Sequence, residues 1–136
     1  MSRSQSLVAL DVGEKRIGVA LADTGVRIAV PYDTVEVDGD ELRKIAEIIV
    51  REEAETIVVG YPRNQQGEAT AQSAYVEDFA ARLEDIGKVV FQDESLTSVT
   101  AENRLKSRKK PYAKGDIDKE AAAIFLQDYL EQRYAS

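Results

Sequence analysis

Short apolar runs of strand length alternate with amphipathic stripes of helical length along this chain of 136 residues. A short apolar run bounded by turn residues is typical of a buried strand, whereas apolar residues three and four positions apart are typical of a helix. The runs lie at residues 7–11, 17–22, 56–60 and 89–91, and the helical stripes at 42–49, 76–83, 97–105 and 121–130. Strands that alternate with helices predict an α/β fold, in which helices flank a mixed β-sheet.

The chain is predicted to form one domain over residues 1–136. Its 43% of hydrophobic and 32% of charged residues are typical of a globular protein, and no repeat, low-complexity tract or linker divides the sequence. The first two runs are expected to pair as a hairpin, with Gly13 in a left-handed turn and Gly18 allowing another backbone to approach closely. A weaker strand is expected at residues 27–30, because the residue before Pro31 favours an extended conformation.

The chain contains neither cysteine nor histidine. Disulfide frameworks, histidine-ligated zinc sites and catalytic Ser-His-Asp or Cys-His groups are therefore excluded. Catalysis would have to use carboxylates, hydroxyls, lysines or a bound metal ion. No apolar stretch approaches the ~20 residues of a membrane span, and residues 1–5 are not followed by the apolar region of a signal peptide. We therefore expect a cytoplasmic protein that does not act at a membrane.

Charge is distributed unevenly along the sequence. The 25 acidic and 18 basic residues give a formal net charge of -7, which argues against a protein that coats nucleic acid in general. Six of the bases, and no acid, lie in the segment from Arg104 to Lys114, which is predicted to be a loop. Such a run is most often only solvated, but its lack of acids favours contact with phosphates. The candidates for these contacts are Arg104, Arg108, Lys109, Lys110 and Lys114.

Three acidic residues stand directly against buried apolar segments. Asp11 ends the first strand, Glu94 follows the strand at 89–91, and Asp118 precedes the apolar stripe of the last helix. If the two strands are parallel or adjacent, Asp11 and Glu94 meet at one edge of the sheet, where the ligands of such sheets bind. Clustered carboxylates repel one another unless a cation neutralises them. Oxygen ligands favour a hard divalent ion, so we expect Mg²⁺ or Mn²⁺ at Asp11, Glu94 and Asp118.

Each of these acids also has a simpler explanation. A carboxylate at a strand end is commonly a solvated turn residue, and one near a helix start commonly interacts with the helix dipole or caps the helix. Capping is the role expected for Asp116, which follows Gly115 and lies on a different face of the helix from Asp118. Pattern alone leaves both interpretations of the three acids open.

Four segments of the chain resemble one known family. They are Leu10 to Ala20 (LDVGEKRIGVA), Val58 to Pro62 (VVGYP), Asp93 to Ser98 (DESLTS) and Asp118 to Gln127 (DKEAAAIFLQ). In order and spacing they are similar to the YqgF family, also called RuvX-like Holliday junction resolvases, over essentially the whole chain. The resemblance implies a ribonuclease H-like fold and a metal-dependent nuclease whose acidic triad falls on Asp11, Glu94 and Asp118.

The resemblance also implies a nucleic-acid substrate. Members are implicated in maturing the 5′ end of precursor 16S ribosomal RNA, and some are described as resolving four-way DNA junctions. We therefore expect hydrolysis of phosphodiester bonds in structured RNA, with branched DNA as the alternative. A resolvase cuts two symmetric strands, so that alternative favours a two-fold homodimer. The family often has arginine where this chain has Ser95 and leucine where it has Tyr61, and Arg16 or the basic segment is expected to grip the phosphate instead.

Two other classes of protein share parts of this pattern. Phosphotransferases of the sugar-kinase and actin type also carry Asp-x-Gly after their first strand, but they close two such domains over a nucleotide, and 136 residues provide only one. A non-catalytic module of the same fold would bind RNA or protein, since fold does not fix function. The presence of all three acids favours the nuclease.

Overall fold

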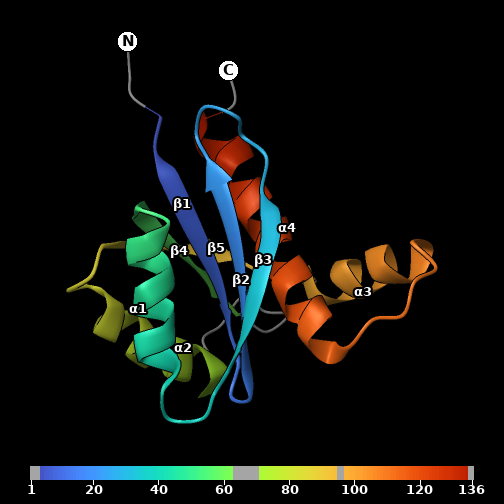
Figure 1. Cartoon of the computed structure of the whole chain (residues 1–136), viewed down its shortest axis with the longest axis horizontal. Coiled ribbons are helices and arrows are strands. Elements are labelled where there is room, and N and C mark those ends of the chain that lie inside the picture. Colours follow the sequence, from blue (N-terminus) through green and yellow to red (C-terminus); the bar gives the residue numbers. More distant parts are fainter. Residues whose placement is uncertain (1–3, 63–70, 95–96, 135–136) are drawn as a thin grey trace.

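A mixed β-sheet flanked by helices forms the computed structural model of the protein, which describes residues 4–62, 71–94 and 97–134 (Figure 1). Its elements, in chain order, are β1 (Ser6–Val12), β2 (Arg16–Asp23), β3 (Val30–Glu36), α1 (Glu41–Arg51), β4 (Ala54–Tyr61), α2 (Ala71–Leu83), β5 (Lys88–Asp93), α3 (Thr97–Ser107) and α4 (Lys114–Tyr134). The strands lie in the order β3-β2-β1-β4-β5. The pairs β1–β2 and β2–β3 are antiparallel, whereas β1–β4 and β4–β5 are parallel. The predicted α/β class, the mixed sheet and the first hairpin are confirmed.

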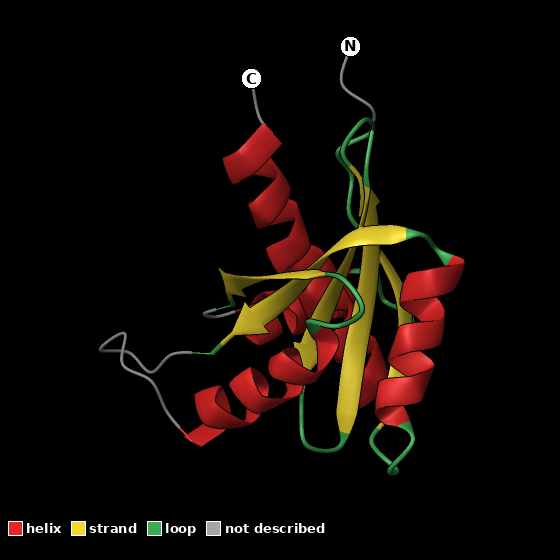
Figure 2. Ribbon diagram, turned by 90° about the vertical axis from the view of Figure 1, so that its left-hand side faces the viewer, coloured by secondary structure: helices red, strands yellow, loops and turns green. Residues whose placement is uncertain are grey.

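Helices cover both faces of the sheet (Figures 1 and 2). Along β1, Val8 and Leu10 pack in the cluster that contains α1 and α2, whereas Leu7 and Ala9 pack in the cluster that contains α4. All four side chains are fully buried, because successive residues of a strand point to opposite faces. A strand covered on both faces appears in the sequence as a continuous apolar run, which explains why β1 and β4 could be located from the sequence.

The last helix packs its predicted stripe onto the sheet. Ala121, Ala122 and Phe125 are fully buried, and Ala122 and Phe125 belong to the cluster formed with β1, β2 and β4. Small alanine side chains allow the helix axis to lie close to the strands. This contact places the first turns of α4 beside the carboxyl end of β1.

The third strand lies further along the chain than the sequence predicts. Residues 27–29 precede β3, and Arg27 is left-handed with φ 63°. Pro31 lies inside β3, opposite Ala20. Because β3 is the edge strand beyond β2, a residue without an N–H group is tolerated there. The extended residue before Pro31 therefore begins the strand instead of ending it.

Two finer expectations are wrong. The run at 89–91 is not buried, because β5 is the opposite edge strand and Phe91 is 46% exposed. Gly13 is not left-handed; among the described glycines only Gly39 has a positive φ. The Gly13 N–H donates to the carbonyl of Arg16 at 3.0 Å, and a Cβ on Gly13 would lie 2.8 Å from that oxygen. This turn needs glycine for space and not for its backbone conformation.

Strands β1, β4 and β5 run in the same direction, so their carboxyl ends share one edge of the sheet. Asp11 is the penultimate residue of β1, Gly60 is the penultimate residue of β4, and Glu94 directly follows β5. In an α/β protein this edge is where ligands bind.

Within the described residues, no helix combines the length and the apolar character needed to cross a membrane.

Candidate active site

Asp11 and Glu94 meet at the carboxyl edge of the sheet, as the sequence predicts. Asp11 is carried by β1 and Glu94 by the residue after β5, and their carboxyl groups lie close enough for each to affect the pKa of the other. Two ionised carboxylates at such a separation repel each other. The contact therefore favours a proton or a cation between the two acids.

Both acids are harder to ionise than usual. Burial, together with the negative charge of Asp11, raises the pKa of Glu94 to about 9. Burial also raises the pKa of Asp11, to about 6, with the nearby Asp118 carboxylate adding to the shift and the interaction with Glu94 opposing it. The pair therefore favours protonation more than isolated carboxyl groups do.

Gly60 makes the space that the Glu94 carboxyl group occupies. A Cβ on Gly60 would collide with Glu94 Oε2 and would lie 2.7 Å from the ring of Phe125. The strand β4 separates β1 from β5, so a side chain here would stand between the two acids. Sequence analysis assigned no role to Gly60; the signal that could have revealed it is a glycine that ends an otherwise β-branched run.

The third acid, Asp118, reaches the site because of Gly18. Gly18 pairs with Asp11 across the β1–β2 ladder. A Cβ on Gly18 would collide with the backbone carbonyl of Asp118 and would lie 2.6 Å from the N atom of Lys119. The close backbone approach predicted at Gly18 is confirmed, and its partner is the second turn of α4.

The side chain of Asp118 is held by Arg16. Arg16 Nε donates to Asp118 Oδ2 at 2.8 Å. Burial raises the pKa of Asp118, while Arg16 opposes that shift and Glu36 adds to it. Arg16, expected to contact phosphate, is thus engaged with an acid in this structure. Within residues 4–62, 71–94 and 97–134, no three acidic side chains converge closely enough to form a metal site.

Asp116 caps α4 from inside the helix. Its Oδ2 accepts a hydrogen bond of 2.9 Å from the N–H of Ala113, which directly precedes the helix, and Lys119 lies 3.4 Å from its other oxygen. The backbone hydrogen bond holds the pKa of Asp116 below its usual range. The capping role is confirmed, but Asp116 is the third helical residue and not the residue before the helix, because α4 begins at Lys114.

The basic segment is not a continuous loop. Its first part belongs to α3 and Lys114 begins α4, so only residues 108–113 connect the two helices. Arg108 donates to Glu120 at 2.7 and 3.5 Å, and Arg104 lies 3.9 Å from the same carboxylate. Glu120 is only 3% exposed. A buried acid needs such partners, and no sequence pattern indicates this pairing.

The lysines of the same segment are differently placed. Lys109, Lys110 and Lys114 form no ion pair with any residue that the structure describes. Lys109 and Lys110 are exposed on the connection between α3 and α4. These lysines, unlike the two arginines, have charges that remain available to a ligand. Ser95, which stands where the family often has arginine, lies outside the described residues.

Comparison with known proteins places these residues in a family. A family profile described as "RuvX: Holliday junction resolvase" matches residues 5–132. A protein of Chloroflexus aurantiacus (strain ATCC 29366 / DSM 635 / J-10-fl) is 43% identical over 136 residues, which cover 95% of this chain and 88% of that protein. A protein of Chloroflexus aggregans is 39% identical, with 95% of each chain covered. Both carry the name "Putative pre-16S rRNA nuclease".

Solved structures with a similar fold are resolvases. Thermus thermophilus RuvC, in complex with a Holliday junction substrate, has a TM-score of 0.55 at 16% identity, with 95% of each chain covered. The Fowlpox virus resolvase, in complex with Holliday junction DNA, has a TM-score of 0.56 at 14% identity, covering 94% of this chain and 98% of the resolvase. The predicted ribonuclease H-like fold and the predicted family are confirmed.

Proposed function

This chain belongs to the family of RuvX Holliday junction resolvases, and we propose that it is a metal-dependent nuclease that hydrolyses phosphodiester bonds of structured nucleic acid. The observation that carries the proposal is that Asp11 and Glu94 converge at the carboxyl edge of the sheet, with Gly60 leaving room for the Glu94 carboxyl group between them. Acids whose pKa values are raised by burial cost stability, and such a cost is commonly kept where the groups have a chemical task.

The donor set at this edge suits a hard divalent cation. Carboxylate oxygens are the ligands that Mg²⁺ and Mn²⁺ prefer, and the chain has no histidine or cysteine that would favour zinc. A cation between Asp11 and Glu94 would remove the repulsion between their carboxylates, as protonation of one of them does. In this proposal Asp11 and Glu94 hold the ion, and Asp118 completes the site. A divalent ion there would neutralise the charge that develops on a phosphodiester during hydrolysis.

Arg16 has two successive partners in this mechanism. In the structure it neutralises Asp118 at 2.8 Å. If Asp118 held the cation, the Arg16 guanidinium would be free to bind a phosphate of the substrate. Arginine is well suited to such an exchange, because carboxylate and phosphate accept hydrogen bonds from its planar fork in the same way. In this proposal Arg16 or the basic segment grips the phosphate in place of the arginine that the family often has where this chain has Ser95.

The substrate proposed is precursor 16S ribosomal RNA, cut at its 5′ end, because relatives that are 39% and 43% identical to this chain, over 95% and 88% of their own lengths, are named as nucleases of that RNA. Such a task places the protein in the cytoplasm. Lys109, Lys110 and Lys114 would contact the phosphates that flank the cleaved bond. Arg104 and Arg108 would contribute to the local positive potential while they remain paired with Glu120.

The second candidate is cleavage of four-way DNA junctions. It is favoured by the two resolvases of similar fold, each determined with junction DNA. A junction has two-fold symmetry, so this function would require a homodimer that presents two sites. Cleavage of a ribosomal RNA precursor places no such requirement on the protein.

One experiment tests the proposal and separates the two substrates. The purified protein is incubated with Mg²⁺ or Mn²⁺ and with a precursor 16S RNA fragment, single-stranded RNA or a four-way DNA junction. We expect cleavage of the precursor, and its loss both in chelator and in the variant Asp11→Asn. Cleavage that continues undiminished in chelator would contradict the metal mechanism, and cleavage of the junction alone would favour the second candidate.

A further inference from the structure

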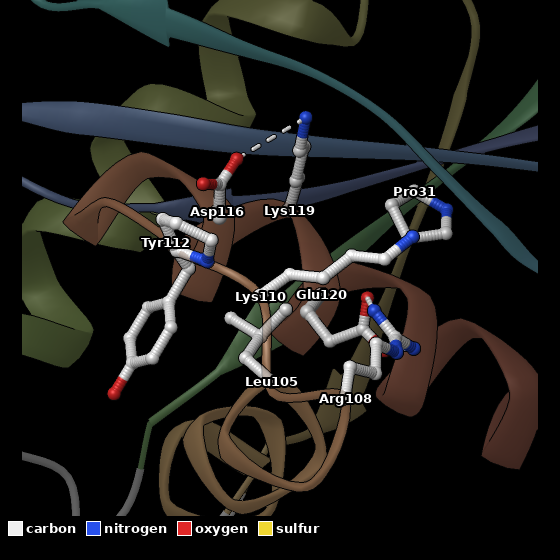
Figure 3. A pocket seen from close by; sticks show the side chains of 9 residues that line it. Pro31, Leu105, Arg108, Lys110, Tyr112, Asp116, Lys119 and Glu120 are labelled. Carbon is white, nitrogen blue, oxygen red and sulfur yellow. Dashed lines mark hydrogen bonds and ion pairs between the residues drawn. The ribbon is translucent and has the colours of Figure 1, made fainter.

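A cavity of about 310 Å³ lies between the end of α3, the first turns of α4 and the start of β3 (Figure 3). Its volume is at the lower end of the roughly 300–1,000 Å³ that small-molecule sites occupy. Part of its wall is apolar and is formed by Pro31, Leu105 and Pro111. The cavity is therefore large enough for one small ligand with an apolar portion. We call it the α3–α4 cavity.

Among the charged side chains of the α3–α4 cavity, one basic side chain is free to bind a ligand. Arg108 donates to Glu120 at 2.7 Å, and Lys119 lies 3.4 Å from Asp116, so each acid has a cationic partner. Lys110 forms no ion pair within the described part of the chain. In Figure 3 its side chain lies across the cavity toward the start of β3. A ligand here would meet one unneutralised ammonium group and no unneutralised carboxylate.

The backbone turn before Lys110 is unusual for its residue type. Lys109 is left-handed with φ 57°, and its N–H donates to the carbonyl of Lys106 in the last turn of α3. The residue that ends a helix in this conformation is usually glycine. Strained backbone that is retained despite its cost often occurs at functional sites.

We propose that the α3–α4 cavity binds one nucleotide of the substrate strand, with its phosphate on Lys110 and its sugar or base on the apolar wall of Pro31, Leu105 and Pro111. This inference rests on the nuclease function proposed above. A phosphate requires a cation that is not already paired, and a nucleoside requires an apolar surface. In the cavity the unpaired ammonium group of Lys110 and the apolar wall are close enough for one nucleotide to contact both. The two acids of the cavity, Asp116 and Glu120, are already neutralised by Lys119 and Arg108.

The position of the cavity indicates which nucleotide it would bind. Asp118 faces the sheet, whereas Glu120 faces the cavity, and two residues correspond to about 200° of rotation around an α-helix. The two sites therefore lie on opposite sides of α4, about 10 Å apart by the width of a helix. A strand must pass around the helix to reach both sites, so at the rise of ~3.4 Å per nucleotide of a stacked strand this distance spans at least about three nucleotides. The bound nucleotide is therefore expected to lie three or more nucleotides from the cleaved bond.

The test varies the length of the strand beside the cleaved bond. A series of RNA substrates carries one to five flanking nucleotides, first on the 5′ side and then on the 3′ side. Wild type is compared with Lys110→Gln, and with Lys106→Gln as a control, which removes one charge from the same basic segment without touching the cavity. The readouts are KM and kcat for each substrate, and Kd from fluorescence anisotropy in the Asp11→Asn background, where binding is measured without cleavage.

For wild type and Lys106→Gln, we expect KM and Kd to rise roughly tenfold when one flank falls below three nucleotides. A tenfold change corresponds to the loss of about one charge-assisted hydrogen bond. Lys110→Gln should already be weaker by that factor and should not respond to flank length, with kcat unchanged. Equal flank dependence in the two lysine variants would overturn the proposal and leave the nuclease function intact. If no substrate is cleaved, the nuclease proposal fails, and the anisotropy series still decides whether the cavity binds a strand.

A free nucleotide is the other source of the same ligand chemistry. Adenosine 5′-monophosphate is therefore titrated into wild type and both lysine variants, with displacement of the labelled RNA as the readout. We expect displacement only at concentrations far above the Kd of the RNA, because a mononucleotide lacks the neighbouring phosphates. Displacement at or below the Kd of the RNA would overturn the proposal of a strand-binding site, since the cavity would then bind a free nucleotide.

Discussion

Replacing Asp11 with asparagine should abolish cleavage and yet stabilise the metal-free protein. In the structure Asp11 and Glu94 lie together, and burial raises the pKa of both carboxyl groups above their ordinary values. Asparagine occupies nearly the same volume and presents an amide to Glu94, so the contact is kept while one of two acidic groups is removed. The expected gain in stability comes from the loss of an unfavourable ionisation.

The sign of the pH dependence follows from the two shifts. An unfolded chain releases the protons of these groups near pH 4, at their ordinary pKa values of 3.8 and 4.5, whereas the folded protein keeps them to about pH 6 and about pH 9. The folded state therefore binds more protons, and the free energy of unfolding falls as the pH rises from 4 toward 9. For Asp11 alone, the rise in pKa from 3.8 to about 6 corresponds to about 3 kcal/mol as an upper limit.

Partial exposure of both carboxyl groups screens their interaction, so we expect Asp11→Asn to gain about 1 to 3 kcal/mol at pH 7. For a chain of this length that is about 4 to 12 °C in Tm. The assay is thermal unfolding followed by circular dichroism in chelator, at pH 4, 5.5, 7 and 8.5. The difference between the variant and wild type should be small at pH 4 and should grow through pH 6.

Magnesium provides the complementary measurement. The ion binds only the folded wild type, so millimolar MgCl₂ should raise the Tm of wild type and reduce the advantage of Asp11→Asn. The reasoning is refuted if Asp11→Asn unfolds at a lower temperature than wild type at pH 7 in chelator. That result would mean that Asp11 stabilises the fold through its hydrogen bonds and that its charge carries no net cost.

Substitutions at four further positions test the site by melting curves and cleavage assays. Gly60→Ala adds a methyl group where Glu94 and Phe125 stand, so it should cost about 1 to 3 kcal/mol and abolish cleavage; a normal melting curve would show that the site has room. Asp116→Asn should change neither stability nor cleavage appreciably, and Asp116→Ala should cost about 1 kcal/mol of stability with cleavage intact. Asp118→Asn should melt normally and cleave orders of magnitude more slowly. The reverse pattern would show that the functional acid is Asp116. Lys109→Gly should raise the Tm, because glycine relieves the left-handed backbone, and should lower the salt dependence of RNA binding by about one unit; an unchanged salt slope would make Lys109 a solvated residue.

The sequence predicts the paired acids because their positions depend on local patterns. Asp11 and Glu94 each end an apolar run, and parallel strands bring such ends to one edge of a sheet. Gly18 was also identifiable, since glycine inside a strand commonly marks the close approach of another backbone. These predictions required only the order of the elements, which the continuous apolar runs of the central strands reveal.

Other features depend on contacts between segments that are distant in the sequence. The pairing of Arg108 with Glu120 joins two helices, and no spacing rule indicates that a glutamate in a run of charged residues will be 3% exposed. The role of Gly60 depends on the strand order, because Glu94 reaches Asp11 across β4. The position of β3 was missed because an edge strand accepts Pro31, which a central strand would exclude.

The separation of the three acids in this structure follows from their own electrostatics. Three carboxylates at one site would repel one another, and the structure reduces this repulsion in two ways: raised pKa values favour protonation of the pair Asp11 and Glu94, and the Arg16 guanidinium neutralises Asp118. A divalent cation would neutralise the same acids. A proton can be displaced to solvent and an arginine can move to a phosphate, so both would be exchangeable when metal and substrate bind. On this argument the two-plus-one arrangement of the acids is the cation-free form of the same site.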